Sequence, residues 1–182
     1  MTTTAETTTA TKWAIDPKHS EVQFKVKHLM ISNVSGTFKV FTGDVQSESE
    51  DFNNAKIHFE IDTNSVDTNL EERDGHLKSP LFLDVQNYPN IIFDGLLQKK
   101  AGNYELTGDV TIHGIKKSIT MAVEHTGLGQ GRFGDTRAGF EVDGKINRKD
   151  FELNASILTQ TGSMVVGEEV KLHFDIQLIK QA

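Results

Sequence analysis

Cysteine is absent from the 182-residue chain, which excludes disulfides, zinc–thiolate sites and thiol nucleophiles. Basic residues are outnumbered by acidic ones, 19 to 26, giving a net charge of −7 with no basic stripe, so we expect no nucleic-acid partner. No run approaches the ~18 apolar residues of a membrane span. The length suits one domain with a hydrophobic core.

The chain also begins without the features of a signal peptide. Residues 1–11 contain seven threonines, no basic residue and no apolar run. We expect a disordered polar arm over residues 1–11 and one domain over residues 12–182. A cytoplasmic location follows from this reading, or a periplasmic one if an export signal has been removed.

Helical periodicity is nearly absent, and alternation with a period of two dominates instead. Val22, Phe24, Val26 and His28 share one face of the first such segment, while charged and polar residues occupy the other. Turns at Ser32-Asn33 and Ser35-Gly36 and a return strand are expected next, and similar segments lie at residues 55–62, 91–97, 106–112, 119–123, 140–146 and 170–178. About eight antiparallel strands are predicted, forming a sheet with one face exposed to solvent. The alternation alone fits a sandwich or a closed barrel.

The exception is the segment from Thr68 to Ser79, which has the composition of one or two helical turns. Thr68 or Asn69 is the expected N-cap, with acidic residues following in the first turn. Pro80 marks the expected end of this helix.

Position-specific motifs run through most of the chain. The spacing W-x-I-D-x-x-H-S-x-V-x-F-x-V-x-H-L begins at Trp13, and further blocks lie at residues 65–93, 106–115, 139–151 and 166–170. Together they resemble the YceI-like family. The resemblance implies an all-β fold, an extended antiparallel lipocalin-like β-barrel of about eight strands with a short helix near one mouth. It also implies a homodimer.

The same resemblance implies a non-enzymatic binding or carrier protein for a polyisoprenoid, an isoprenoid quinone or a fatty-acyl amphiphile. Apart from such a bound lipid or quinone, we expect no cofactor. The inward rows supply the expected ligand-binding residues, which are Val22, Phe24, Val26, His28, Phe38, Phe59, Phe93, Phe140, Leu172, Phe174 and Ile176. Their phenylalanines fit either a lined tunnel or a packed core.

Polar residues at the expected barrel mouth have two readings. Arg73, Asp74 and His76 either tie the helix to the barrel or frame the entrance for an amphiphile. His28, expected to point inward, is either a hydrogen-bonded core residue or an anchor for a ligand head group. Arg148 and Asp150 are expected to serve turn formation.

Other functions have weaker support. Asp16, His19 and Ser20 resemble parts of a hydrolase triad, but no Gly-x-Ser-x-Gly elbow is present, and local turn hydrogen bonds explain them better. The seven histidines lack metal-ligand spacing, so no metal site is expected. The remaining alternatives are a ligand-free structural or stress-response interaction module, and a hydrolase or isomerase using His28 or the Arg73-Asp74-His76 cluster.

Overall fold

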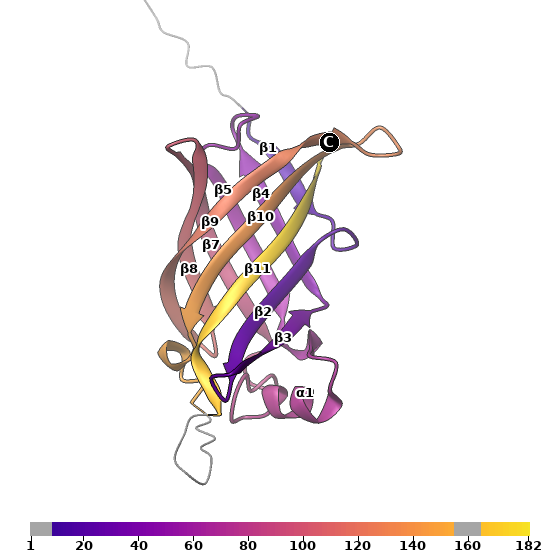
Figure 1. Cartoon of the computed structure of the whole chain (residues 1–182). Coiled ribbons are helices and arrows are strands. Elements are labelled where there is room, and N and C mark those ends of the chain that lie inside the picture. Colours follow the sequence, from indigo (N-terminus) through magenta and orange to yellow (C-terminus); the bar gives the residue numbers. More distant parts are fainter. Residues whose placement is uncertain (1–8, 155–164) are drawn as a thin grey trace, which may run out of the picture.

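A computed structural model describes residues 9–154 and 165–182 and shows an antiparallel β-barrel. Eight strands form a closed ring, because the first strand pairs with the last (Figure 1). In ring order they are β1 (Thr11–Ile15), β4 (Phe41–Ser47), β5 (Ala55–Asp62), β7 (Asn90–Lys100), β8 (Asn103–Ile112), β9 (Ile115–Gln130), β10 (Thr136–Asn147) and β11 (Val166–Lys180). The prediction of a closed antiparallel barrel of about eight strands is confirmed.

Three further strands branch from the ring, and they are β2 (Glu21–His28), β3 (Ser32–Phe38) and β6 (Val66–Asp67). β11 is long enough to pair with β1 near its C-terminal end and with β2 along the rest of its edge. The backbone of Gln177 falls between these two partners. Its carbonyl accepts a hydrogen bond from the amide of Asp16, and its amide donates to the Ser20 hydroxyl, so neither group is left unpaired.

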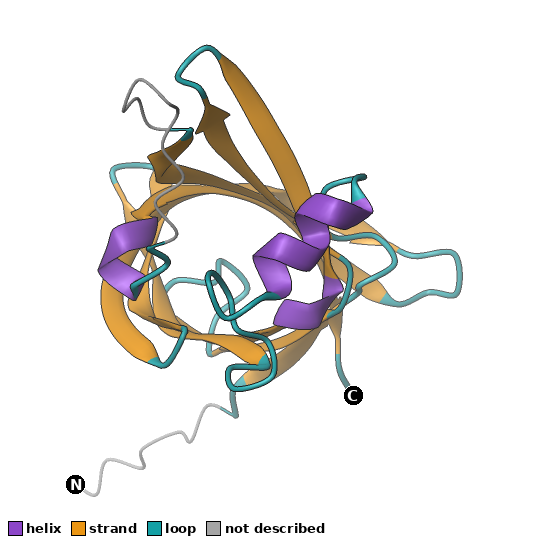
Figure 2. Ribbon diagram, turned by 90° about the horizontal axis from the view of Figure 1, so that it is seen from below, coloured by secondary structure: helices purple, strands orange, loops and turns teal. Residues whose placement is uncertain are grey.

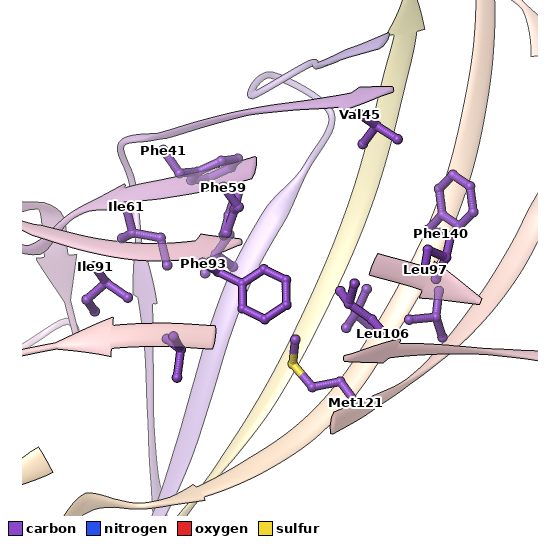
Figure 3. Close-up of a cluster of buried hydrophobic side chains, with 14 of the residues drawn as sticks. Phe41, Val45, Phe59, Ile61, Ile91, Phe93, Leu97, Leu106, Met121 and Phe140 are labelled. Carbon is purple, nitrogen blue, oxygen red and sulfur yellow. The ribbon is translucent and has the colours of Figure 1, made fainter. Parts of the chain in front are cut away.

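Alternate residues of each strand point into the barrel and form one continuous apolar core (Figure 3). Phe59 of β5, Phe93 of β7 and Met121 of β9 lie near its centre, each less than a tenth exposed. Within the part of the chain that the structure describes, no helix is long and apolar enough to cross a membrane.

The two ends of the barrel differ. The β4–β5 connection lies at the upper end of Figure 1. Its Phe52 is fully buried. Its ring centroid lies 5.0 Å from that of Trp13 and 5.0 Å from that of Phe140. These three rings close what we call the plugged end.

The opposite end carries the helix α1 (Glu71–Lys78), and we call it the helix end. Two short 3-10 helices, η1 (Thr63–Ser65) and η2 (Arg148–Phe151), also belong to the connections at this end. Viewed from below, the helices lie at the rim of the ring that the strands form (Figure 2). A short helix near one mouth was predicted and is present.

Some local expectations were wrong. Leu70 occupies the N-cap position of α1 without a side-chain cap, because the Thr68 hydroxyl is hydrogen-bonded to Asp74 and Asn69 adopts a positive φ of 61°. β1, β4 and β6 were not predicted as strands, and Ser32-Asn33 and Ser35-Gly36, expected as turns, belong to β3. Of the expected polar arm, residues 1–8 lie outside the described residues, and Thr11 pairs with Ser47 as the first residue of β1.

Candidate functional site

An apolar cavity of about 160 Å³, the first cavity, lies inside the barrel toward the helix end. Its walls come from β2, β3 and β6 on one side and from β7 to β11 on the other. Leu77 of α1 and the following Phe82 and Leu83 cover it. Apolar cavities of about this size stay dry and accept a benzene-sized guest, so the space favours hydrocarbon over water.

A second cavity of about 70 Å³ lies toward the plugged end. Phe52, Val45 and Leu97 are among its walls. Phe93, Met121 and Phe174 line both cavities, so these three side chains separate the two spaces. The two cavities therefore lie next to each other along the inside of the barrel.

All the apolar residues that the sequence placed in the ligand site line one or both cavities. The first cavity contains Val22, Phe24, Val26, Phe38, Phe93, Leu172 and Phe174, and the second contains Phe59, Phe93, Phe140, Phe174 and Ile176. Residues from the two ends of the chain meet here because β2 pairs with β11, with Phe24 opposite Leu172. The inward residues of β2 and β11 therefore line the same cavity, as expected.

His28 was expected to point into the barrel, but it lines neither cavity. It lies in a groove of about 310 Å³ on the outside of the helix end, which we call the entrance groove. Glu72, Arg73 and His76 of α1 line it together with His28. The groove shares Phe24, Val26, Leu77, Phe82 and Val166 with the first cavity. A few apolar side chains therefore separate a groove with polar groups from a dry interior.

Arg73 and Asp74 fasten α1 to Thr68, the residue that directly follows β6. The Arg73 side chain donates to the Thr68 hydroxyl at 2.7 Å and to its carbonyl at 2.8 Å. Asp74 accepts from the Thr68 amide at 2.9 Å and from its hydroxyl at 2.6 Å. Thr68 is only 3% exposed, so this network anchors the start of the segment that covers the first cavity.

The other end of this covering segment is fastened in a similar way. The hydroxyl of the buried Thr63 lies within hydrogen-bond distance of the carbonyls of Tyr88 and Pro89, at 2.9 and 2.8 Å. The cover over the first cavity is therefore held at both of its ends, and its middle presents Leu77, Phe82 and Leu83 to the cavity.

Arg148 is a lining residue that sequence reasoning assigned to a turn. Arg148 is 3% exposed, and its guanidinium donates to the carbonyls of Leu153, Val166 and Gly167 at 2.6, 3.1 and 2.8 Å. Burial lowers the pKa of Arg148, and the charge of Glu168 opposes that shift. By binding three carbonyls, Arg148 joins η2 to the start of β11 at the wall of the first cavity.

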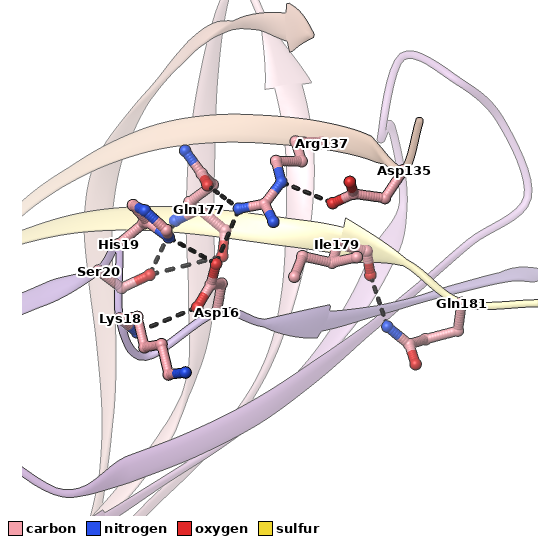
Figure 4. Close-up of polar contacts among 9 residues, drawn as sticks. All are labelled: Asp16, Lys18, His19, Ser20, Asp135, Arg137, Gln177, Ile179 and Gln181. Atoms are coloured by element: carbon pink, nitrogen blue, oxygen red, sulfur yellow. Dashed lines mark hydrogen bonds and ion pairs between the residues drawn. The ribbon is translucent and has the colours of Figure 1, made fainter. Parts of the chain in front are cut away.

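Asp16, His19 and Ser20 take part in a structural network on the outside of the barrel (Figure 4). Asp16 accepts from His19 Nδ1 at 2.7 Å, from the Lys18 amide at 3.0 Å and from Arg137 at 2.8 Å. Burial alone would raise the pKa of Asp16, but these three hydrogen bonds outweigh it and lower the pKa.

Ser20 contacts the backbone of Gln177 and not His19. The local turn interpretation therefore holds for Asp16, whereas Ser20 makes a long-range contact. Arg137 was not identified from the sequence, because nothing near it indicates that β10 lies beside the β1–β2 turn.

Two histidines on the outer wall each pair with an aspartate on the neighbouring strand. His58 Nδ1 lies 2.7 Å from Asp94, and His173 Nδ1 lies 2.7 Å from Asp143. The hydrogen bonds to these carboxylates raise the pKa of both histidines, against a smaller opposing effect of burial. Across residues 9–154 and 165–182, no group of three or more His, Asp or Glu side chains is placed to hold a metal ion.

Comparison with known proteins places this geometry in a family. Residues 13–178 match the model of the YceI-like domain. Protein YceI of Salmonella newport is 37% identical over 175 residues, covering 94% of this chain and 88% of the relative.

Solved structures are similar as well. The Campylobacter jejuni YCEI protein is 30% identical with a TM-score of 0.71, covering 86% of this chain and 90% of that one. Burkholderia cenocepacia BcnA has a TM-score of 0.77 at 22% identity, covering 90% and 98%. A polyisoprenoid-binding domain from Saccharophagus degradans has a TM-score of 0.72 at 16% identity, covering 93% and 98%.

Proposed function

The chain belongs to the YceI-like family, and from that premise we propose that it is a non-enzymatic carrier for a polyisoprenoid, an isoprenoid quinone or a fatty-acyl amphiphile. The observation that carries the proposal is the pair of dry apolar cavities along the barrel axis. The printed description of the Saccharophagus degradans domain, polyisoprenoid binding on the same fold, supports the same ligand class.

In this proposal the tail enters from the helix end. It passes Phe24 and Val26 into the first cavity and reaches the second by displacing Met121. Each buried methylene contributes about 0.8 kcal/mol, so part of a long tail suffices for tight binding. The polar head remains in the entrance groove beside His28 and His76. No step requires a metal.

Native mass spectrometry of gently purified protein, followed by organic extraction, tests the proposal. We expect a mass above 20.2 kDa for the chain and a lipid in the extract. An unliganded mass, together with no uptake of a fluorescent fatty-acyl or isoprenoid probe, would contradict it.

Paired substitutions on β2 localise the tail. Val26 lines both the entrance groove and the first cavity, whereas the neighbouring Lys25 points to the outside. Val26→Trp is expected to weaken probe binding, and Lys25→Trp is expected to leave it unchanged. Overpacking costs about 1–3 kcal/mol, so circular dichroism must first show that both variants fold. Equal probe binding by the two folded variants would exclude this path.

His28→Gln tests the head-group site. Loss of one hydrogen bond to a ligand is expected to weaken binding by about 1 kcal/mol, roughly fivefold. If His28 instead served catalysis, the same change would abolish turnover of a hydrolysable acyl probe. Unchanged binding and activity would leave His28 as a structural residue of the groove.

A ligand-free structural module is the second candidate, and the small volumes of the two cavities favour it. The first cavity accepts a benzene-sized group without rearrangement, which is far less than a long tail. An interior that stays closed would leave both cavities empty in the native mass measurement.

We also propose a homodimer, on the family resemblance alone. A single sedimenting species near 20.2 kDa at high micromolar concentration would contradict it.

A further inference from the structure

Exposed apolar side chains gather around the entrance groove. Ile31 is 81% exposed, Met30 63% and Leu81 62%. Leu29, Met30 and Ile31 connect β2 to β3 directly after His28 of the groove, and Leu81 adjoins Phe82, another groove residue. Leu29 and Leu70 are also exposed at the same rim. We call these five side chains the apolar rim.

The hairpin tip adopts a backbone conformation that apolar residues rarely occupy. The Ile31 amide donates to the His28 carbonyl, and the two central residues of this turn, Leu29 and Met30, have φ values of 51° and 59°. Hairpin turns with two positive φ angles strongly prefer Asn and Gly. Folding alone would therefore favour other residues here, which indicates that Leu29 and Met30 serve another purpose.

We propose that the apolar rim inserts into the surface of a lipid bilayer and places the entrance groove at the membrane, where an amphiphile can pass between bilayer and barrel. This inference rests on the proposed carrier function, because only a membrane-resident ligand makes such docking useful. The rim side chains come from separate loop tips and not from one flat face. Such an arrangement suits a fluid interface that needs no complementary shape.

The charges at the rim also bear on the kind of membrane. Lys27 and Arg73 line the groove together with Glu72, so both signs are present, and the whole chain carries −7. Attraction to anionic lipid therefore cannot drive docking, and apolar insertion must. We expect binding to neutral phosphatidylcholine vesicles, and we expect it to persist at high salt.

Cosedimentation with phosphatidylcholine vesicles tests the inference. The key variant combines Leu29→Asn with Met30→Gly, which removes two rim side chains and supplies the residues that the turn prefers, so its thermal midpoint should not fall. We expect it to lose vesicle binding on the order of tenfold. The matched control combines Leu128→Ser with Phe133→Ser at the plugged end, where Phe133 is 91% exposed. The control should bind vesicles like the unmodified chain.

The docking would be overturned by no vesicle binding by the unmodified chain, by equal losses in the two variants, or by loss of binding at high salt. A dimer that the rim variant converts to monomer without vesicles would also overturn it, since the rim would then be a protein interface.

Uptake of a fatty-acyl probe delivered in solution separates docking from carriage. The rim variant should take up the probe normally. Absence of probe uptake in every variant, with rim-dependent vesicle binding intact, would contradict the carrier function and leave the docking supported.

Discussion

Met121 is the side chain whose removal most directly tests whether the barrel contains a divided channel. It is 4% exposed and lines both cavities, as do Phe93 and Phe174. Truncation to alanine removes the flexible part of the barrier without touching the entrance groove. We therefore expect Met121→Ala to convert two small cavities into one continuous space.

The loss of stability expected for Met121→Ala follows from the burial of its side chain. A buried Met→Ala change costs about 2–5 kcal/mol, as the sum of lost transfer energy and the new cavity. A ligand that binds only the folded chain, supplied at one hundred times its Kd, returns about 2.7 kcal/mol. Leu106→Ala is the matched control, because Leu106 is 6% exposed and lines only the second cavity. Leu106→Ala should lower the free energy of unfolding by a similar amount, but it leaves Met121 in place between the two cavities.

Urea unfolding and binding of a short and a long fatty-acyl probe give the readout. The joined channel should accept roughly two more methylenes of the long probe, at about 0.8 kcal/mol each, so its affinity should rise on the order of tenfold in Met121→Ala. The short probe should change little. In Leu106→Ala the ratio of long- to short-probe affinity should stay as in the unmodified chain. Equal ratios in the two variants would refute the divided channel.

The sequence predicted the barrel well because its signal is repeated in every long strand. Residues 55–62 were predicted as a strand, and β5 has these same bounds. Apolar and polar residues alternate clearly wherever one face of a strand is buried and the other is exposed to solvent. β1 and β4 were missed for physical reasons. β1 is five residues long, and β4 has only two large apolar residues, Phe41 and Val45, to show its alternation.

The candidate site was predictable where it lies on strands and was missed where it lies elsewhere. Phe24 and Phe174 could be placed inside from their register alone. Phe82 and Leu83 come from a connection, which has no periodicity to show which residues turn inward. Arg148 was missed because a buried cation is normally recognised by a nearby acid, and its partners are backbone carbonyls that leave no trace in the sequence.

Three further predictions follow from particular contacts. Because the pKa of His58 is raised by Asp94, the pair contributes stability that is complete below the unfolded pKa of ~6.5 and is lost as pH rises through the folded value. Asp94→Asn should lower the pKa of His58 in an NMR titration, and an unchanged pKa would refute the pairing. Arg148→Met should cost about 3 kcal/mol or more in urea unfolding, because each of three carbonyls loses a donor worth ~1–3 kcal/mol; a loss below 1 kcal/mol would show that water replaces the guanidinium. Gly144→Ala should narrow the channel, because the added Cβ would lie 2.5 Å from Met121 Cγ and must push that side chain away, toward the cavities that it lines. The long probe should therefore bind more weakly to Gly144→Ala, and adding Met121→Ala should restore its affinity, whereas a loss of affinity that survives the second substitution would place the obstruction elsewhere.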